Sequence, residues 1–243
     1  MEMEFIKVKN YDEMSEKACE ILVDRMSKLQ QPVIGLATGS TPEGLYKLLI
    51  DKYKKGELDF SNTVTFNLDE YVGLDDDDPN SYHYFMNDKL FNHINIPAEN
   101  IHVPSGVAEN IQQECLDYES AMKVAGQIDV QLLGIGQNGH IGFNEPGTAF
   151  DSRTHLVDLD ESTIQTNARF FDSIEDVPTK AVSMGIGTIL ESKEVLMVIS
   201  GASKQEAVKH LLSGEITEDV PASALHKHPN VTVIVDEAAW GDN

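Results

Sequence analysis

The sequence has few cysteines, few basic residues and no long apolar run. Its 243 residues include only two cysteines, Cys19 and Cys115, both in apolar patterns typical of helices. A chain of this length can bury enough surface to fold without disulfides, so we expect reduced packing thiols, as in cytoplasmic proteins. The acidic start "MEMEFIKVKN" does not resemble a signal peptide, and no run is long enough to span a bilayer. We therefore expect a cytoplasmic protein with no membrane partner.

Basic residues are the scarcer charged class. The chain has 18 Lys and Arg against 41 Asp and Glu, a formal net charge of −23. Such a field repels nucleic acids and anionic membranes, so neither is expected as a partner. It also repels anionic metabolites. Any phosphate site must therefore be locally basic or lined by backbone N–H groups.

Apolar runs alternate with amphipathic segments along the chain, without repeats or linkers, which predicts a single domain over residues 1–243. Strands are expected at 31–38, 62–70, 100–106, 128–136, 155–159, 180–187, 194–200 and 230–237, and helices at 42–56, 81–94, 110–126 and 203–214. This alternation predicts an α/β fold: a mostly parallel, doubly wound, Rossmann-like sheet with helices on both faces. Such sheets bind ligands beyond the carboxyl ends of their strands.

The first unusual strand end is "LATGSTPEG", in which residues 38–41 join a strand to a helix. Hydroxyls and backbone N–H groups at a helix N-terminus form a natural phosphate cradle. The Gly-Lys-Ser/Thr of a P-loop does not follow, which disfavours a nucleoside triphosphate. An ordinary turn with Thr41 as helix N-cap explains the segment equally well.

The second unusual strand end is "NLDEY", where Asp69 and Glu70 directly follow an apolar run. A partly desolvated carboxylate there can have a raised pKa and serve as a general base. The alternative is a carboxylate that caps a helix or ties down a loop. Residues 75–78, four consecutive aspartates, indicate a solvated loop because they lack the oxygen-ligand spacing of a calcium site.

The stretch "GIGQNGHIGFNEP" begins like a dinucleotide fingerprint, with Gly134, Gly136 and Gly139 as G-x-G-x-x-G. That fingerprint needs a helix to start within the loop, and the glycines and proline that follow make a helix improbable. His140 and Glu145 then have two readings. No second His or Cys stands at zinc-ligand spacing, so no metal is expected. A histidine oriented by a carboxylate would be an acid–base catalyst, and a structural histidine is the alternative.

The two remaining candidates are cations. Lys204 in "SGASKQEA" opens a helix, where a positive charge is unfavourable unless an anion compensates for it. Arg169 in "NARFFD" is notable because the chain has so few basic residues. Either residue could bind phosphate, and either could equally be a surface charge.

Seven segments in chain order resemble glucosamine-6-phosphate deaminases, also called glucosamine-6-phosphate isomerases, over essentially the whole chain. They are "LATGSTPEGLY", "FNLDEYVGL", "SYHYFMND", "GIGQNGHIGFNEPG", "SRT", "ARFFD" and "GASKQEA". "DEYVGL" together with "GHIGFNEPG" is highly specific. The resemblance implies D-glucosamine 6-phosphate as substrate, fructose 6-phosphate and ammonia as products, and no metal or redox cofactor.

The resemblance also implies roles for individual residues. Those matched to phosphate binding are Thr38, Gly39, Ser40, Thr41, Arg169 and Lys204. Asp69 matches the base that moves a proton between C2 and C1, and His140 with Glu145 matches the ring-opening groups. Residues 150–175 match a mobile lid. Some members carry Asp at position 138, so the Asn138 of this chain is expected only to orient His140.

A second departure from the family pattern concerns regulation. Allosteric members carry basic residues just after "SRT" and a longer C-terminus, whereas this chain has His155, Val157 and Asp158 there. We therefore expect no activation by N-acetylglucosamine 6-phosphate. Members of this kind favour a monomer, with a homo-oligomer as the alternative.

Two other functions compete with this interpretation. A 6-phosphogluconolactonase needs no base over C2, so "DEYVG" with "NEPG" argues against it. A non-catalytic sugar-phosphate sensor of the kind found in transcription regulators would need an attached helix-turn-helix, for which the acidic chain leaves no room.

Overall fold

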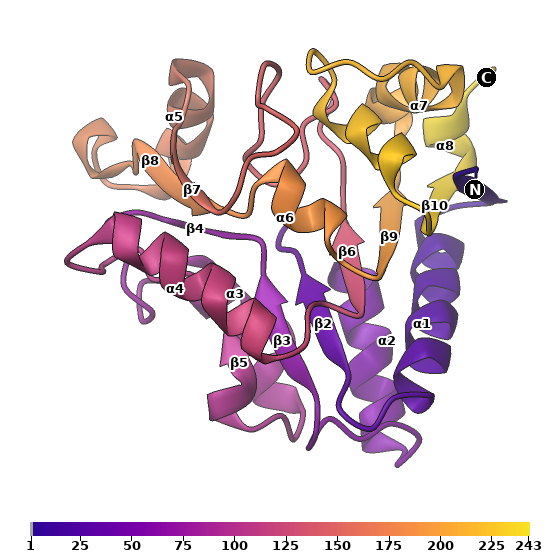
Figure 1. The fold of residues 1–243 in the computed structure, drawn as a ribbon, viewed down its shortest axis with the longest axis horizontal. Helices are drawn as coiled ribbons and strands as arrows, with labels where there is room; N and C mark the ends of the chain where they lie inside the picture. Colours follow the sequence, from indigo (N-terminus) through magenta and orange to yellow (C-terminus); the bar gives the residue numbers. More distant parts are fainter. Residues whose placement is uncertain (1) are drawn as a thin grey trace.

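The computed structural model describes residues 2–243, and its ten strands form two sheets (Figure 1). The strands are β1 (Glu4–Val8), β2 (Val33–Leu36), β3 (Val64–Asn67), β4 (Asp69–Tyr71), β5 (Ile101–His102), β6 (Val130–Leu133), β7 (His155–Asp158), β8 (Lys180–Ser183), β9 (Glu194–Ile199) and β10 (Val231–Asp236). Seven of them make one sheet in the order β1-β10-β9-β6-β2-β3-β5, with every neighbouring pair parallel. The predicted parallel α/β fold is confirmed.

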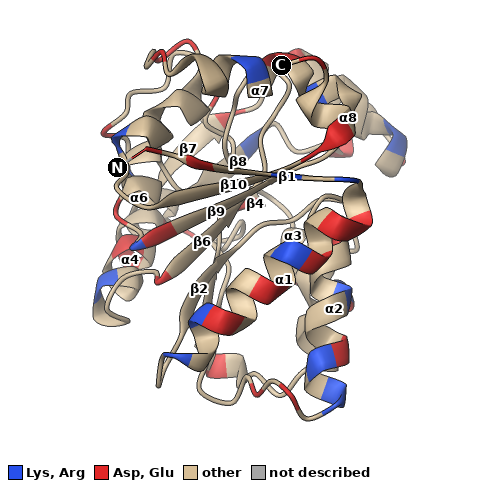
Figure 2. Ribbon diagram, turned by 90° about the vertical axis from the view of Figure 1, so that its right-hand side faces the viewer, with Lys and Arg blue, Asp and Glu red and all other residues tan. Residues whose placement is uncertain are grey.

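Helices cover both faces of this sheet, as Figure 2 shows with the sheet seen nearly edge-on. The helices are α1 (Tyr11–Ser27), α2 (Glu43–Lys54), α3 (Tyr82–Lys89), α4 (Ile111–Val124), α5 (Glu161–Asn167), α6 (Ile186–Leu190), α7 (Gln205–Ser213) and α8 (Glu237–Trp240). Side chains of α1, α2 and α3 share one apolar core, and those of α4, α6 and α7 share the other.

The two-residue period of a strand distributes side chains between these cores. In β9, Val195, Met197 and Ile199 enter the core beneath α4, α6 and α7. Leu196 and Val198 enter the core beneath α1, α2 and α3. A strand covered on both faces must be apolar at every position, which is why it reads as an uninterrupted run.

The order of strands along the sheet reverses between β2 and β6. From β2 the chain proceeds outward through β3 to β5, and from β6 it proceeds the other way through β9 to β10. Loops that leave two such neighbouring strands diverge to opposite faces, which opens a crevice at their carboxyl ends. The fold therefore predicts a ligand site after Leu36 and Leu133, the last residues of β2 and β6.

A second, three-stranded antiparallel sheet of order β4-β8-β7 was not predicted. The expected strand 62–70 is really two strands that belong to different sheets. Leu68 separates them: its N–H bonds Leu36 in the large sheet, and its carbonyl accepts from Met184 beside the small one. A continuous apolar run cannot reveal such a change of partner, because both environments are buried.

Three other predicted elements differ in extent. The strand expected at 100–106 is only β5, and the strand expected at 180–187 stops at Ser183, before α6. The helix expected at 81–94 ends at Lys89 and is followed by the separate 3₁₀ turn η1 (Phe91–His93). The two cysteines are buried and unpaired, in α1 and α4. Within residues 2–243 no helix has both the length and the apolar character needed to cross a bilayer.

Candidate active site

A cavity of about 710 Å³ opens at the carboxyl ends of β2 and β6. Of the residues singled out from the sequence, it is lined by Thr38, Gly39, Thr41, Asp69, Asn138, His140, Glu145 and Lys204. Ser40 lines a neighbouring pocket of about 610 Å³, between the first turns of α1 and α2. Arg169 lines neither pocket.

The loop after β2 presents an open helix N-terminus to this cavity. Gly39 has a φ of +97°, a conformation in which only glycine is unstrained, and it turns the chain into α2. The N-cap position of α2 is occupied by Pro42, with no side-chain hydrogen bond. The alternative in which Thr41 caps the helix is therefore wrong. Hydroxyls and N–H groups of Thr38, Gly39 and Thr41 are left beside the cavity, as a phosphate cradle requires.

Lys204 supplies positive charge from the opposite loop. It ends the 3₁₀ turn η5 (Ala202–Lys204) and directly precedes α7, as the sequence indicated. Among the described residues that line the cavity, it is the one lysine or arginine. Its Nζ donates to the carbonyl of Ile135 at 2.6 Å, and burial lowers the pKa of its ammonium group. An anion in the cavity would stabilise the charged form of Lys204 and so raise its pKa again.

His140 is held by one amide side chain. Its Nδ1 lies 2.8 Å from the Oδ1 of Asn138, which also accepts from the His140 N–H at 3.1 Å. The Nδ2 of Asn138 donates to Glu145 at 2.9 Å, whereas Glu145 itself stands 3.6 Å from Nδ1. An amide oxygen only accepts, so Nδ1 carries the proton and Nε2 holds a lone pair. The predicted orienting role of Asn138 agrees with this geometry.

Burial lowers the pKa of His140, and Lys204 lowers it further, against the raising effects of Glu145 and Asp160. The ring is therefore neutral at neutral pH and can accept a proton at Nε2. A neutral imidazole with one nitrogen tied down is suited to proton transfer on a bound ligand.

Gly136 makes room for this ring. A Cβ there would lie 2.0 Å from the His140 Nδ1, closer than any non-bonded contact allows. Its N–H bonds the His140 carbonyl at 2.9 Å, which closes the loop on itself. Residues 137–150 contain turns and a single bridge between Ile141 and Asn144, but no helix. The glycine pattern is therefore not a dinucleotide fingerprint.

Asp69 is the first residue of β4 and is only 8% exposed. Burial, followed by the adjacent charge of Glu70, raises its pKa to about 8. No described residue donates a hydrogen bond to its carboxylate, although the side chain lines the cavity. A carboxylate that lacks protein donors in a ligand cavity is available to take a proton from the ligand.

The small sheet brings Asp69 to the His140 loop. Ser183 pairs with Asp69 across β4 and β8, and its Oγ accepts from the Phe143 N–H at 3.2 Å. A Cβ at Gly142 would lie 3.9 Å from the Asp69 Oδ2. Asp69 and Gly142, which are far apart in the sequence, thus line one wall, and the sequence alone carried no signal for this contact.

The segment that was predicted to form a lid contributes residues that sequence reasoning missed. Side chains on and before α5 line the cavity, namely Asp160, Ser162, Thr163 and Thr166. Asp160 caps α5, accepting from the Thr163 N–H at 2.8 Å, so its helix-cap pattern was a usable signal. Tyr82, from the first turn of α3, completes the wall beside Asp69.

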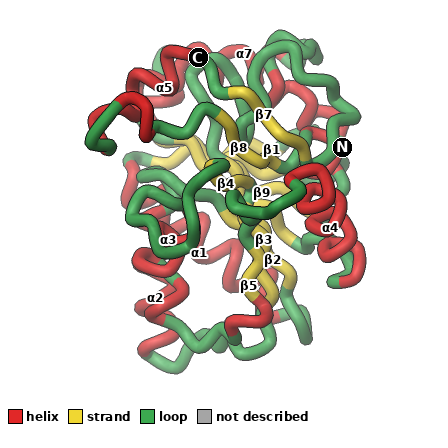
Figure 3. The backbone as a smooth tube through the Cα atoms, turned by 90° about the vertical axis from the view of Figure 1, so that its left-hand side faces the viewer, coloured by secondary structure: helices red, strands yellow, loops and turns green. Residues whose placement is uncertain are grey.

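Arg169 stands apart from these residues. It lies on the 3₁₀ turn η3 (Ala168–Phe170), and its guanidinium rests 4.6 Å from the centre of the Phe170 ring. Figure 3 shows the neighbouring helix α5 at the periphery, joined to the rest by loops. A role for Arg169 in phosphate binding would therefore require this segment to move. Nowhere in residues 2–243 do three or more His, Cys, Asp or Glu side chains gather as a metal would need.

Comparison with known proteins agrees with this geometry. The model of the family described as glucosamine-6-phosphate isomerases/6-phosphogluconolactonase matches residues 9–234. A protein of Oceanobacillus iheyensis named glucosamine-6-phosphate deaminase is 53% identical over 240 residues, covering 99% of this chain and 96% of its own. One of the same name from Clostridium perfringens (strain 13 / Type A) is 54% identical over 237 residues, covering 98% of each.

Solved structures extend the comparison. One described as a monomeric glucosamine-6-phosphate deaminase superposes with a TM-score of 0.94 at 52% identity, over 98% of this chain and 99% of that one. A 6-phosphogluconolactonase from Thermotoga maritima has a TM-score of 0.76 at 21% identity, over 96% and 99%, and so shares the fold. The chain belongs to the family of glucosamine-6-phosphate isomerases and 6-phosphogluconolactonases.

Proposed function

We propose that this protein is a glucosamine-6-phosphate deaminase, which converts D-glucosamine 6-phosphate and water into D-fructose 6-phosphate and ammonia. One observation carries the proposal: a buried carboxylate without protein donors, Asp69, shares a cavity with the neutral His140. Lactone hydrolysis removes no carbon-bound proton, so a lactone hydrolase needs no base over C2. Relatives that carry the deaminase name support the same choice.

Ring opening is assigned to His140. Its Nε2 removes the proton of the O1 hydroxyl, and the same nitrogen returns a proton to O5 as the C1–O5 bond breaks, which leaves an aldehyde at C1. Asn138 keeps Nδ1 protonated and the ring in place. Glu145, 3.6 Å from that nitrogen, stabilises the imidazolium while it exists.

Isomerisation is assigned to Asp69. The aldehyde acidifies the C2–H bond, and the carboxylate takes that proton to give an enolate. The O1 of the enolate takes a proton from the C2 ammonium group of the substrate, which gives a neutral enolamine. Returning the proton to C1 gives a 2-imino sugar, which water hydrolyses to fructose 6-phosphate with release of ammonia. Residues 38–41 and Lys204 hold the phosphate, and Arg169 joins them when the lid closes. Fixing the phosphate orients C1 and C2 between the two groups that exchange protons.

Ammonia release from D-glucosamine 6-phosphate by protein treated with a chelator tests the proposal. Asp69→Asn is expected to lower kcat by about a thousandfold, since a general base contributes 10²–10⁴. Binding of the phosphorylated product, measured by calorimetry, should survive. Asp129→Asn is a matched control, because Asp129 pairs with Lys193 at the amino ends of β6 and β9, away from the cavity. Near-normal turnover in Asp69→Asn would contradict the assignment.

The same protein distinguishes the competing functions. Hydrolysis of 6-phosphogluconolactone without ammonia release would indicate the lactonase of the shared family. Binding of sugar phosphates without either reaction would indicate a sensor. We further propose that the protein is a cytoplasmic monomer, as the solved relative is described to be monomeric. Light scattering after gel filtration checks the oligomeric state.

A further inference from the structure

A second carboxylate lies directly behind the proposed base. Glu70 follows Asp69 in β4, and strand geometry directs the two side chains to opposite faces. The Asp69 side chain lines the cavity, whereas Glu70 is completely buried on the far side, between β4 and α3. The mechanism described above makes no use of Glu70.

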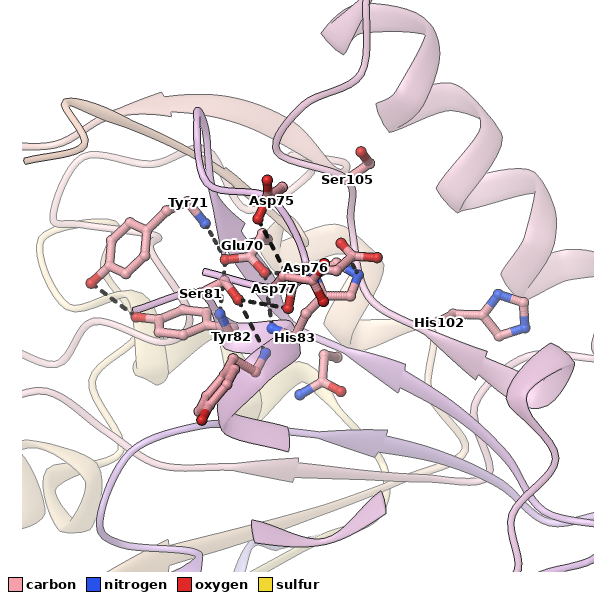
Figure 4. A network of polar contacts seen from close by, with 12 residues as sticks. Glu70, Tyr71, Asp75, Asp76, Asp77, Ser81, Tyr82, His83, His102 and Ser105 are labelled. Atoms are coloured by element: carbon pink, nitrogen blue, oxygen red, sulfur yellow. Dashed lines mark hydrogen bonds and ion pairs between the residues drawn. The ribbon is translucent and has the colours of Figure 1, made fainter. Parts of the chain in front are cut away.

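Four donors surround the Glu70 carboxylate (Figure 4). Its Oε1 accepts from the backbone N–H of Tyr71 at 2.8 Å and of Tyr82 at 3.0 Å. Its Oε2 accepts from the His83 N–H at 3.0 Å and lies 2.7 Å from the His83 Nδ1. Tyr82 and His83 are the first residues of α3, so these N–H groups belong to its otherwise unpaired first turn. Four donors fit an ionised carboxylate, because a carboxylic acid would need an acceptor.

His83 connects this buried group to the acidic loop. While its Nδ1 bonds Glu70, its Nε2 lies 3.3 Å from a carboxylate oxygen of Asp76. The imidazole is only 18% exposed, whereas Asp76 is 67% exposed. The ring therefore lies between a buried carboxylate and a solvated one, where the 75–78 loop approaches the start of α3.

Two cavity residues depend on where Glu70 lies. Asp69 is its neighbour in the same strand. Tyr82 is fixed through its backbone N–H, and its ring stacks on Phe143 with centroids 6.3 Å apart and planes 7° from parallel. Both residues line the cavity. Glu70 thus joins the strand that carries the base to the helix that walls the site.

The charge of Glu70 also acts on Asp69, whose pKa it raises in addition to the effect of burial. The other titratable groups coupled to Asp69 are the phenols of Tyr71, Tyr82 and Tyr118. Burial raises the pKa of all three, so they remain neutral across the physiological range. Beyond the base itself, Glu70 faces the Tyr71 phenol and His83, and Asp76 lies on the far side of the His83 ring.

We propose that Glu70 is a positioning residue for the Asp69 base, and that His83 holds Glu70 in place through its backbone N–H and its Nδ1. The inference rests on the proposed deaminase activity. Neither Glu70 nor His83 contacts substrate. They act through Asp69 and Tyr82, whose positions and electrostatic environment they set.

Glu70→Gln tests the charge. Glutamine keeps the length of the side chain, but its NH₂ group must face N–H donors, and the negative charge is lost. We expect kcat to fall about tenfold with KM within about twofold, because the phosphate contacts lie on other loops. The acid limb of kcat/KM should move to lower pH by about one unit, as expected when a neighbouring like charge is removed. A merely structural role would lower activity without moving the limb.

Glu194→Gln is the matched control for this variant. Glu194 is also a buried carboxylate, paired with Arg25 at 2.9 Å, but it lies at the amino end of β9, away from the cavity. The control should lose thermal stability while keeping the wild-type pH profile.

A pair of variants at His83 tests the second half of the proposal and does not depend on Glu70→Gln folding. Asparagine can place a donor near the position of Nδ1, whereas leucine offers none. We expect His83→Asn to keep kcat within about threefold of wild type and His83→Leu to lose about tenfold, with KM nearly unchanged in both. Equal activity in the two variants would overturn the role of His83.

A titration that does not depend on turnover separates this inference from the proposed function. Protein labelled with ¹³C at the aspartate carboxyls, with Asp69→Asn for assignment, reports the Asp69 midpoint by NMR. That midpoint should be lower in Glu70→Gln than in wild type, even if the protein releases no ammonia. An unchanged midpoint would overturn the charge coupling. A wild-type protein inactive on D-glucosamine 6-phosphate would overturn the deaminase assignment instead.

Discussion

The pKa of Asp69 depends on its surroundings in the folded chain, which its place in the sequence does not show. The sequence places it after an apolar run and predicts burial. Its pKa of about 8 depends on that burial and on the neighbouring charge of Glu70, whose own four donors come from Tyr71, Tyr82 and His83. The sequence anticipated both possible roles for these adjacent acids, a base or a carboxylate tied to local structure. In the structure Glu70 is tied to the start of α3, whereas Asp69 has no donor among residues 2–243 and remains the predicted base.

A pH profile measures this residue directly. Because the Asp69 pKa is raised, its carboxylate predominates only above pH of about 8, and a base must be ionised to act. We expect kcat/KM for the free enzyme to fall about tenfold per unit below that midpoint and to level off above it. At alkaline pH, KM should rise earlier than for an ordinary lysine, since burial lowers the pKa of Lys204. A flat profile between about pH 6 and 9 would contradict the assignment of Asp69.

Asn138 was the position at which the sequence departed from some relatives. The structure explains how an amide can serve there: its oxygen accepts from His140 while its nitrogen donates to Glu145. An aspartate could accept from the histidine, but it would face the Glu145 carboxylate without a hydrogen bond. The amide therefore connects the two groups without placing like charges side by side.

At the scale of elements, the loop after β6 depends on glycine for space. Gly136→Ala would push a Cβ against the His140 ring, and we expect kcat on the cyclic substrate to fall about a hundredfold, as an ångström-scale displacement of a catalytic group can cause. Gly134→Ala is the control in the same loop, because a Cβ there meets nothing within 4 Å. Thermal unfolding should distinguish lost positioning from lost folding. Equal losses in the two variants would argue against this role for Gly136.

The segment from Asp160 to Phe170 is the other element that matters for function. Arg169 lies outside the cavity, so its proposed phosphate contact predicts that the segment closes over a ligand. We expect Arg169→Ala to raise KM about tenfold, the loss of a charge-assisted contact of roughly 1.4 kcal/mol. Hydrogen exchange over 160–170 should slow when fructose 6-phosphate binds.

Lys28→Ala is the control for lost positive charge, since Lys28 is exposed just after α1. A KM that changes equally in both variants would show that Arg169 acts only through the overall charge of the chain. Unchanged exchange in the presence of ligand would contradict closure.

At the scale of the whole molecule, the scarcity of basic residues has a functional consequence. Figure 2 shows acidic and basic residues mixed along the outer helices, and the chain as a whole carries −23. An anionic substrate therefore meets overall repulsion and must be held by local groups, the N–H groups and hydroxyls of residues 38–41 and the ammonium of Lys204. A single cation, Lys204, beside the uncapped N-terminus of α2 is consistent with a ligand that carries one phosphate group.

Regulation is also a property of the whole molecule. His155, Val157 and Asp158 lie in strand β7. None of them is a Lys or Arg that could bind a second sugar phosphate. We expect a hyperbolic dependence of rate on substrate, unchanged by added N-acetylglucosamine 6-phosphate. Ammonia-release kinetics with and without that compound check this expectation. A sigmoidal curve made hyperbolic by it would refute the prediction.

Local sequence patterns were enough to predict the alternation of strands and helices, the sheet covered on both faces, the family and several of the residues that line the cavity. These features follow from local periodicity and from short motifs, which need no knowledge of distant partners. Three features became known only from the folded chain: the run 62–70 divides between two sheets, Asp69 meets the His140 loop through Ser183, and Arg169 stands outside the cavity. They could not be predicted because burial, hydrogen-bond partners and electric fields arise between segments far apart in the chain, and no local pattern records them.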